Sequence, residues 1–438
     1  MKFYDRDREQ QTLANILRQS KNEARMTVLM GRRRIGKTEL SLRCGDSTVL
    51  YFFVAKKTET LLCRDFIQEI KDKLNVPVLG EPSSFIDIFK FILHLSEGLA
   101  FTLVIDEFQN FQKVNLTVFG DIQREWDLHK GQSHLNLILS GSVFTLMKKI
   151  FEDYEEPLFG RAHEKMTLQA FTTSTLKEIL GDFNPDYSPD DLLTLFSITG
   201  GVPWYVSLLL DKGKIREDDM LSALTEENSP FINEGKNILI EEFGSDYATY
   251  FSILACIASG MKTRSEIEHE LGNDNIGSYL QKLENYYGLI HKSLPIFSKT
   301  SGKKVRFVID DCFLIFWFRF FYKYQGLVEN KALLTLGAII RRDYDSVSGF
   351  MLEKYFTRKF QEEGRYIVGK WWDRKGENEI DLIIVDPLSQ EARIYEIKRQ
   401  AERYKESLLQ AKVEKMLEQV PELRNMTIRL GVLSLKDL

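Results

Sequence analysis

The sequence predicts an α/β protein that begins with a parallel sheet and ends with a second, smaller α/β domain. Short apolar runs alternate with helical stretches in the first part of the chain, which is the pattern of a parallel sheet with helical crossovers. A glycine-rich turn directly follows the first of these runs. Near the C-terminus, charged side chains interrupt other apolar runs. The expected strands of the first sheet are residues 27–30, 49–54, 101–105, 135–139 and 165–168.

Composition limits the classes of protein to which the chain can belong. Its length suggests roughly two to four domains, and a hydrophobic content of 43% is ordinary for a globular protein. The net charge of -5 argues against a basic surface made for bulk nucleic-acid binding. The cysteines lack C-x-x-C spacing, which predicts neither a zinc knuckle nor a disulfide framework and favours the cytoplasm. They are Cys44, Cys63, Cys256 and Cys312.

No membrane segment is expected. The charged residues 1–6 stand where a signal peptide would need an apolar core. The most apolar run, residues 312–321, contains Arg319 and is too short to span a bilayer. This run therefore predicts a core helix.

The glycine-rich turn matches the phosphate-binding P-loop, G-x-x-x-x-G-K-[ST], at every required position. Gly31 and Gly36 let the backbone curl so that its N–H groups point at phosphate oxygens. Lys37 is expected to reach the β- and γ-phosphates, and the Thr38 hydroxyl to bind Mg²⁺. The motif therefore predicts nucleotide binding. The expected binding residues are Gly31, Arg32, Arg33, Arg34, Ile35, Gly36, Lys37, Thr38 and Glu39.

An acidic pair follows the apolar run at residues 101–105, which is a Walker B pattern. Asp106, at the carboxyl end of this strand, is expected to hold Mg²⁺ directly or through water. Glu107 is expected to orient and polarise the attacking water as a general base. The pair alone is a weak signal, but it gains weight because it follows a complete P-loop.

Three further polar positions are candidates in the same domain. Ser140 and Ser142 follow the run at residues 135–139, and either can sense the γ-phosphate or position water; the alternative is an N-cap for a helix over 143–150. Arg161 precedes the last strand and is a candidate to stabilise γ-phosphate charge, in cis or in a neighbouring subunit of a homo-oligomer. An ordinary surface arginine is the alternative for Arg161.

Together these motifs resemble the prokaryotic AAA-like "archaeal ATPase" family, which belongs to the STAND class of signalling ATPases. The resemblance implies an ASCE-type sheet, ATP as the nucleotide, and places for Arg6 and Pro203 at the nucleotide, with the turn at Pro203 coupling its state to domain orientation. Asp5 and Asp7 depart from the opening motif of the family, which has glycine and glutamate there. The stretches that carry the resemblance are residues 3–9, 31–38, 105–108, 140–142 and 200–203.

The middle of the chain is expected to contain a helical lid over residues 172–244 and a winged helix with an aromatic connector helix over 245–345. Three helical stretches and a hairpin predict the winged helix. Basic residues in its wing suit phosphate contacts with DNA, but its third helix is not basic, which favours an intramolecular hinge. The basic residues of the wing are Lys299, Lys303, Lys304 and Arg306.

The last domain, residues 346–438, is expected to hold a second site. Asp381 interrupts one apolar strand, and Glu396 and Lys398 share a face of the next because residues two apart in a strand point the same way. Glu353, on the preceding helix, is expected to add a carboxylate. With Asp381 and Glu396 as metal ligands, this set can bind Mg²⁺ and position water for phosphodiester hydrolysis. A solvated strand edge with alternating charges is the alternative.

This residue order resembles the PD-(D/E)xK nuclease superfamily, which has a restriction-endonuclease-like fold. Asp381, Glu396 and Lys398 match its core motif and Glu353 its helix acid, although the leading proline is absent. Residues 341–438 have 19 Lys and Arg against 18 Asp and Glu, whereas the rest of the chain is acidic, which makes this domain the favoured nucleic-acid face.

Two functions from different classes follow. The first is an ATPase whose nucleotide state controls a metal-dependent DNA nuclease. The second is a STAND-type signalling or scaffold ATPase whose nuclease-like domain only binds nucleic acid or a protein partner.

Overall fold

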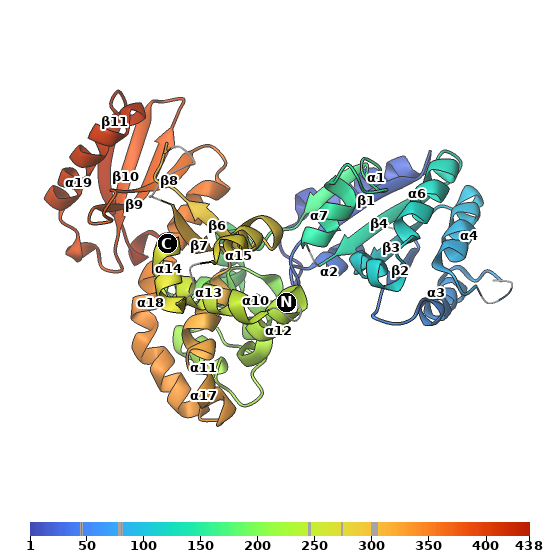
Figure 1. Ribbon diagram of the computed structural model, residues 1–438, viewed down its shortest axis with the longest axis horizontal. Helices are drawn as coiled ribbons and strands as arrows, with labels where there is room; N and C mark the ends of the chain where they lie inside the picture. The colour runs from blue at the N-terminus through green and yellow to red at the C-terminus, as the bar shows by residue number, and fades with distance from the viewer. Residues whose placement is uncertain are drawn as a thin grey trace. The chain divides into compact units, whose positions relative to one another are not determined.

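A computed structural model of the chain describes residues 1–43, 45, 47–77, 80, 82–142, 144–243, 247–272, 275–298 and 305–438 (Figure 1). The chain divides into two compact units. The first comprises Asp5–Gln169, and the second comprises Met1–Tyr4 together with Ala170–Leu438. The boundary expected at residue 171 lies close to this division, and the boundaries expected at 244 and 345 lie inside the second unit.

The first unit is built on a five-stranded parallel sheet with the order β2-β3-β4-β1-β5. Strand β4 lies between β1, which leads into the P-loop, and β3, which ends in the acidic pair. This arrangement confirms the predicted P-loop α/β fold class. Because all the strands are parallel, their carboxyl ends share one edge of the sheet, where ligand-binding groups gather. The strands are β1 (Arg25–Met30), β2 (Val49–Phe53), β3 (Phe101–Asp106), β4 (Leu135–Gly141) and β5 (Glu164–Thr167).

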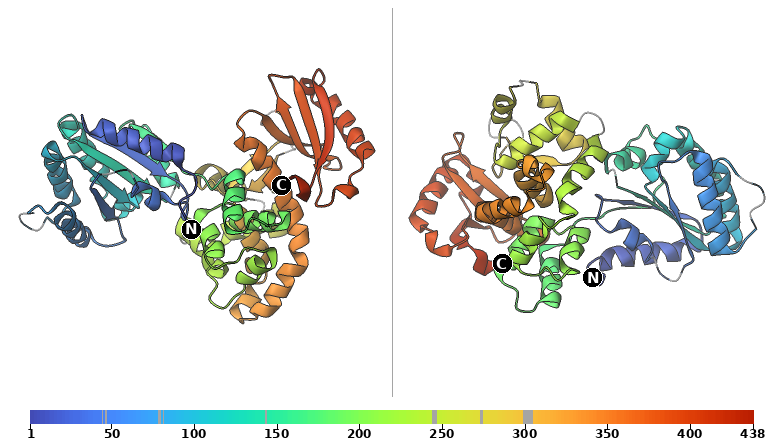
Figure 2. Two further views of the ribbon diagram at one scale, coloured as in Figure 1. Left: turned by 180° about the vertical axis from the view of Figure 1, so that it is seen from behind. Right: turned by 90° about the horizontal axis from the view of Figure 1, so that it is seen from below.

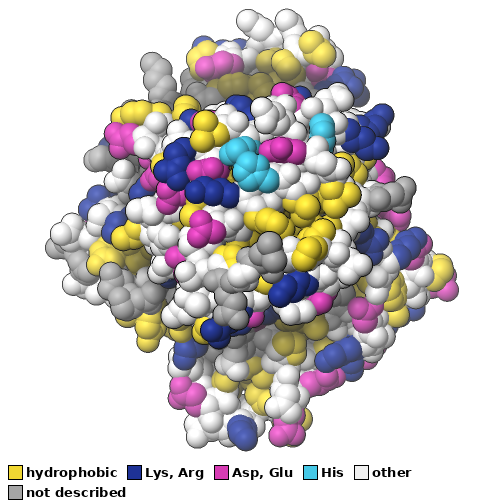
Figure 3. Space-filling view, turned by 90° about the vertical axis from the view of Figure 1, so that its right-hand side faces the viewer, with side chains coloured by type: hydrophobic (Ala, Val, Ile, Leu, Met, Phe, Trp, Pro, Cys, Tyr) yellow, Lys and Arg dark blue, Asp and Glu magenta, His cyan; other side chains and the backbone are white. Residues whose placement is uncertain are grey.

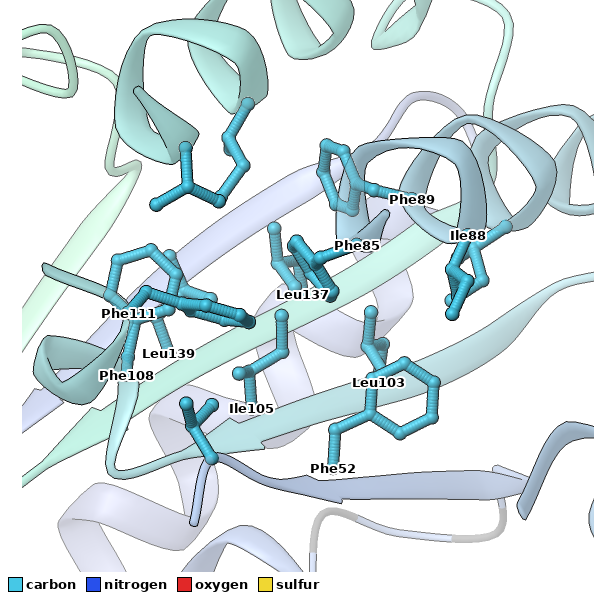
Figure 4. Close-up of a cluster of buried hydrophobic side chains, with 14 of the residues drawn as sticks. Phe52, Phe85, Ile88, Phe89, Leu103, Ile105, Phe108, Phe111, Leu137 and Leu139 are labelled. Carbon is cyan, nitrogen blue, oxygen red and sulfur yellow. The ribbon is translucent and has the colours of Figure 1, made fainter. Parts of the chain in front are cut away.

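Helices cover both faces of this sheet (Figure 2). One face packs against α3, α4, α6 and α7 through a continuous apolar core, in which Phe85 and Phe89 lie over the strand residues Leu103 and Leu137 (Figure 4). Burial on both faces explains why the strands read as unbroken apolar runs in the sequence. The helices are α1 (Asp7–Ser20), α2 (Lys37–Ser41), α3 (Glu59–Leu74), α4 (Phe85–Gly98), α5 (Phe111–Val114), α6 (Val118–His129) and α7 (Phe144–Glu152).

The second unit begins with the expected helical region. At the turn between α9 and α10, Gly201 has φ +80°, and a Cβ there would lie 2.6 Å from the carbonyl oxygen of Phe171, so glycine is required. Arg358 donates to the carbonyl oxygens of Gly200 at 2.7 Å and of Phe171 at 2.6 Å, which ties this turn to a later helix. The helices are α8 (Thr173–Phe183), α9 (Pro189–Thr199), α10 (Pro203–Leu210), α11 (Glu217–Ala223) and α12 (Phe231–Phe243).

Three helices and a two-stranded hairpin follow in the order expected of a winged helix. Thr263 caps the second of these helices in a capping box with Glu266. The aromatic connector then begins at Cys312 and continues beyond α16 as a π-helical turn at Phe318–Tyr322. The elements are α13 (Tyr247–Ser259), α14 (Arg264–Leu271), α15 (Gly277–Gln281), β6 (Ile290–Ser293), β7 (Arg306–Ile309), α16 (Cys312–Trp317) and α17 (Gln325–Glu329).

The C-terminal part is a four-stranded sheet with helices, in the order β11-β10-β9-β8. Strands β8, β9 and β10 pair antiparallel, whereas β10 and β11 pair parallel, with α19 as their crossover. The preceding helix, α18, is longer than expected and runs without a break through residue 346. The elements are α18 (Leu333–Glu362), β8 (Ile367–Trp372), β9 (Glu379–Asp386), β10 (Glu391–Ile397), α19 (Glu406–Gln419) and β11 (Thr427–Leu433).

The β6–β7 hairpin packs against the C-terminal sheet. The Ile296 N–H donates to the carbonyl oxygen of Lys370 at 2.8 Å, and the Ile296 side chain is buried in the core of that sheet. The Arg306 guanidinium lies 4.2 Å from the centre of the Trp372 ring and donates to Glu379 at 2.8 Å. Arg306 is one of the wing residues whose charge suits DNA phosphates, but its side chain is 12% exposed and is held by these contacts within the second unit.

Several expectations fall on positions outside the described residues. They are Cys44, residue 143 at the start of the helix after Ser142, residue 245 at the start of the winged helix, and the wing residues Lys299, Lys303 and Lys304. Within the described part of the chain, no helix has both the length and the apolar character needed to cross a membrane.

Candidate nucleotide site and carboxylate–lysine cluster

The P-loop connects β1 to α2 and encloses the side chain of Lys37. Gly36 has φ +89°, a conformation that glycine adopts without strain. Lys37 is only 6% exposed, and its Nζ donates to the carbonyl oxygens of Gly31 at 2.8 Å and of Arg32 at 2.9 Å. The ammonium group is thus held inside the loop, which surrounds the phosphates in P-loop proteins.

Thr38 and Asp106 meet at the carboxyl edge of the sheet. The Thr38 hydroxyl donates to Asp106 Oδ2 at 2.7 Å, and the Tyr51 hydroxyl donates to the same oxygen at 2.8 Å. Burial and the charge of Asp106 raise the pKa of Tyr51, so its hydroxyl remains a neutral donor. A hydroxyl and a carboxylate in contact are oxygen ligands of the kind that Mg²⁺ prefers, so the residues present fit this ion.

Glu107 is held by two polar side chains. Its Oε2 accepts hydrogen bonds from Ser142 Oγ at 2.8 Å and from Gln109 Nε2 at 2.5 Å. The two serine candidates therefore differ in their surroundings. Ser142 contacts the expected general base, whereas the fully buried Ser140 hydroxyl has no hydrogen-bond partner among the described residues.

Arg6, which directly precedes α1, lies against the P-loop. It is 5% exposed, and its Nη2 donates to the carbonyl oxygen of Gln169 at 2.5 Å and approaches that of Ile35 at 3.5 Å. A place near the nucleotide is consistent with these contacts but stays a prediction. Within the loop, Arg33 and Glu39 are exposed, and the Glu39 carboxylate accepts a hydrogen bond from Arg43 at 2.8 Å. Glu39 thus takes part in a surface pair.

Arg161 lies at the opposite end of the sheet from the P-loop. It precedes β5, whose first residue pairs with Thr27 near the start of β1, whereas the P-loop follows the end of β1. Its guanidinium donates to Asp127 Oδ2 at 2.9 and 3.1 Å. The expected action on the γ-phosphate in cis is therefore wrong, because a parallel sheet separates its two edges by the length of a strand.

Pro203 is the first residue of α10, in the second unit. Proline suits this position because it lacks an N–H, and an N–H in the first turn of a helix would have no partner within the helix. A role for Pro203 at the nucleotide stays a prediction.

The four candidates of the C-terminal sheet come together with two further lysines. Lys398 Nζ lies 2.8 Å from Glu396 Oε2 and 3.6 Å from Asp381 Oδ2. The Ile397 N–H donates to Asp381 at 2.9 Å. We call this group the carboxylate–lysine cluster; its members are Glu353, Lys370, Asp381, Glu396, Lys398 and Lys412.

The additional lysines pair with the remaining carboxylate oxygens. Lys370, on β8, donates to Glu353 Oε2 at 2.6 Å, and Lys412, on α19, pairs with Glu396 Oε1. Three carboxylates thus face three ammonium groups. The arrangement brings all the expected acids to one place, and it adds positive charges that the sequence did not reveal.

The cluster shifts the proton affinity of its carboxylates in opposite directions. Burial and the negative charge of Glu353 raise the pKa of Asp381 to about 7. Burial acts in the same sense on Glu396, but the hydrogen bonds of Lys398 and Lys412 outweigh it and lower the pKa of Glu396. Carboxylates that differ in this way within one site are typical of functional centres, although structural ion-pair networks also produce them.

Metal binding at the cluster should strengthen as the pH rises through about 7, because a protonated Asp381 carboxyl is a poor ligand.

The stability of the metal-free chain should also depend on pH. Without metal, the folded chain holds a proton on Asp381 that the unfolded chain releases at lower pH. The free energy of unfolding should therefore fall as the pH rises from about 4 to about 7. Mn²⁺ titrations and denaturant unfolding across this range measure both effects. Asp381→Asn should abolish both contributions, and equal pH profiles in the two proteins would contradict the assignment.

Four residues of these sites were not identified from the sequence. Gln109 stands two positions after Glu107, a spacing at which its side chain can reach back. Lys370 is a lone charge in an apolar strand, which is the same signal that identified Asp381. Tyr51 and Lys412 carried no comparable signal, because their roles depend on which strand or helix lies beside them.

Comparison with known proteins shows what the first unit resembles. Residues 19–150 match the family of AAA domains. The first unit is therefore a P-loop domain that is similar to AAA domains over these residues. A Walker-type ATPase of Pyrococcus abyssi shares the fold, with a TM-score of 0.53 and 20% identity over 72% of this chain and 96% of that one. The ORC2 protein of Aeropyrum pernix is a weaker match, with a TM-score of 0.46 and 16% identity over 74% of this chain and 96% of its own.

The similarity to known proteins extends beyond residues 19–150. Residues 317–413 match a family described as archaeal and bacterial proteins of unknown function, a segment that includes α18 and β8 to β10. An uncharacterised protein of Methanocaldococcus jannaschii is 28% identical over 406 residues, which cover 90% of this chain and 87% of the relative. This relative therefore matches the chain over both units. These matches assign no activity to the carboxylate–lysine cluster.

Proposed function

We propose that the chain binds and hydrolyses ATP with Mg²⁺, and that its nucleotide state controls the C-terminal domain, which acts as a metal-dependent DNA nuclease. The ATPase part rests on one observation above all. The Thr38 hydroxyl and the Asp106 carboxylate, which are 68 positions apart in sequence, are in hydrogen-bond contact beside Lys37. This is the arrangement needed to hold Mg²⁺ against a phosphate chain.

Each residue of the nucleotide site has a distinct role in this proposal. Lys37 would leave its carbonyl partners to bind the β- and γ-phosphates, and Thr38 and Asp106 would hold Mg²⁺, whose charge would offset that of the phosphates. Glu107 orients the attacking water and accepts its proton, and Ser142 and Gln109 fix the direction of the Glu107 carboxylate. Positioning of this kind is the main protein contribution to phosphoryl transfer.

The nuclease part is supported by the composition of the carboxylate–lysine cluster. Asp381 and Glu396 offer carboxylate oxygens on adjacent strands to a divalent ion, Glu353 adds a third from α18, and Lys398 lies between them. A metal ion bound there supplies Lewis-acid stabilisation and a more acidic water. Lys398 then serves to hold the scissile phosphate or to stabilise the charge that develops on it.

The charges of the cluster also indicate which ligands it binds together. Once Asp381 is ionised, three lysines balance the three carboxylates, so a divalent ion alone would leave an excess positive charge. A phosphodiester offsets part of this excess, because each backbone phosphate carries one negative charge. We therefore infer that metal and nucleic acid bind more tightly together than apart.

The pairing of the three lysines with the three carboxylates also supports the second candidate function. Because lysines occupy the carboxylate oxygens, the cluster is also a stable arrangement without any metal, as a structural ion-pair network. A STAND-type signalling or scaffold ATPase would use this domain only to bind nucleic acid or a protein partner. Cleavage assays separate the two candidates.

The decisive experiment is cleavage of plasmid and linear DNA by the full chain with Mg²⁺ or Mn²⁺, in the presence and absence of ATP. Wild type should cut, and Asp381→Ala should lose at least 100-fold in rate, since removal of a metal ligand leaves water unactivated. Glu391→Ala is the matched control, because Glu391 lies on the same strand β10 as Glu396 but outside the cluster. Absence of cleavage by wild type under every nucleotide condition would favour the scaffold function.

A further inference from the structure

Two histidines and a glutamate adjoin one another at the surface of the AAA domain. The rings of His94 and His129 lie 4.6 Å apart between centroids, at 74°. His94 Nδ1 is 3.0 Å from Glu97 Oε1, and one ligand atom from each of the three residues lies within 4.8 Å of the other two. Adjoining histidine side chains with acidic and basic neighbours appear on the face shown in Figure 3.

Helix geometry explains why the three side chains meet. His94 and Glu97 are three positions apart on α4, a spacing that places both on one face of the helix. His129 is the last residue of α6, which packs beside α4 over the sheet. Both helices end just before strands begin, so the group lies at the edge of the sheet opposite the P-loop. The ATPase residues described above do not include any of the three.

A fourth side chain, Glu125, lies beside this group and pairs with two basic residues. Glu125, one turn before His129 on α6, is 5% exposed. Its Oε1 accepts a hydrogen bond from Arg124 at 3.0 Å and lies 3.7 Å from Lys90, while its Oε2 is 3.7 Å from His129 Nε2. The two basic residues therefore pair with Glu125, and its second oxygen faces the His129 ring. Carboxylates in such positions commonly orient metal-binding histidines.

We propose that His94, Glu97 and His129 form a binding site for a divalent late first-row metal ion, for which Zn²⁺ is the probe. Two imidazoles and one carboxylate are a common zinc ligand set, with water in the fourth position. Zinc bonds of about 2.0–2.1 Å at tetrahedral angles place ligand atoms about 3.3 Å apart. His94 and Glu97 nearly meet this spacing at 3.0 Å, and His129 has to approach by up to about 1.5 Å.

The three side chains are exposed enough to make this movement, and an ion bound to them would stabilise the domain. The side chains of His94, Glu97 and His129 are 59, 38 and 21% exposed, so rotation does not disturb the core. An ion held by residues of both α4 and α6 would join two of the helices that cover one face of the sheet. Binding should therefore raise the thermal stability of the AAA domain, because the ligand binds the folded state.

The test is a Zn²⁺ titration of the chelator-treated full chain, in competition with a chromophoric chelator and at pH 8, where free imidazole is neutral. Excess Mg²⁺ and ATP occupy the oxygen-ligand sites of the nucleotide-binding domain. Wild type should bind one more equivalent of Zn²⁺ than the double variant His94→Ala/His129→Ala, and Glu97→Gln should weaken this equivalent at least tenfold. Zn²⁺ should raise the Tm of wild type but not that of the double variant.

The control variant is His291→Ala. His291 is 49% exposed and pairs with Asp310 at 2.7 Å, so its loss removes a histidine–carboxylate pair from the other unit. This variant should bind Zn²⁺ as wild type does. ATP binding by the double variant verifies that its AAA domain is folded. Equal stoichiometry and affinity in wild type and a folded double variant would overturn the proposal.

Discussion

Lys37→Ala should abolish measurable nucleotide binding. The lysine ammonium is buried in the P-loop and, in the proposed function, donates to two phosphates. Charge-assisted hydrogen bonds contribute about 1.5–3 kcal/mol each. Loss of both should weaken ATP binding by roughly 100-fold or more, since each 1.4 kcal/mol is a factor of ten. Titration with a fluorescent ATP analogue or by calorimetry measures the change directly.

The control for this prediction is Lys57→Ala. Lys57 belongs to the same unit but is 47% exposed and pairs with Asp65 on the surface. Its removal should leave nucleotide affinity unchanged. Thermal unfolding of both variants shows whether the lost contacts of Lys37 with the Gly31 and Arg32 carbonyls destabilise the domain. A folded Lys37→Ala protein that binds ATP as tightly as wild type would refute the assigned role.

Glu107→Gln should bind ATP normally and hydrolyse it about 10²–10⁴ times more slowly. The amide has the same shape as the carboxylate, and its oxygen can still accept from Ser142 or Gln109, so the local structure should be retained. It cannot accept the proton of the attacking water, and Thr38 and Asp106 remain to hold Mg²⁺. Single-turnover phosphate release, together with a separate measurement of ATP affinity, distinguishes loss of chemistry from loss of binding.

Glu152→Gln is the matched change at the surface of the same unit. Glu152 lies at the end of α7 and pairs with Lys165 at 3.7 Å, outside the nucleotide site. Its hydrolysis rate should equal that of wild type. If Glu107→Gln hydrolyses ATP at the wild-type rate, another residue activates the water, and the contacts of Ser142 and Gln109 with Glu107 are only structural.

The strands and the P-loop were predictable because their signals are local. An apolar run such as residues 101–105 is buried on both faces of the sheet, and this burial is encoded residue by residue. The P-loop likewise needs glycine, lysine and threonine at fixed spacings along a single turn. Asp381 and the Glu396–Lys398 pair were predictable for the same reason. A charged residue that interrupts an apolar strand is visible in the local sequence.

The partners of charged side chains were not predictable in this way. Arg161 seemed suited to the γ-phosphate, yet the parallel sheet places it at the other edge, beside Asp127. Arg306 seemed suited to DNA, yet the hairpin that carries it packs on the C-terminal sheet, where Trp372 and Glu379 bind its guanidinium. Long flexible side chains take partners from whichever element lies beside them, and the sequence does not state which one that is.

By itself, the sequence determined that this chain has a nucleotide-binding P-loop domain and a later sheet with carboxylates at defined positions. Only the tertiary structure decided that Tyr51 and Thr38 share one Asp106 oxygen, that Ser142 rather than Ser140 contacts Glu107, and that three lysines balance three carboxylates in the C-terminal cluster. The physical reason is the range of the interactions. Backbone conformation and burial pattern depend on neighbours along the chain, whereas hydrogen bonds and ion pairs depend on neighbours in space.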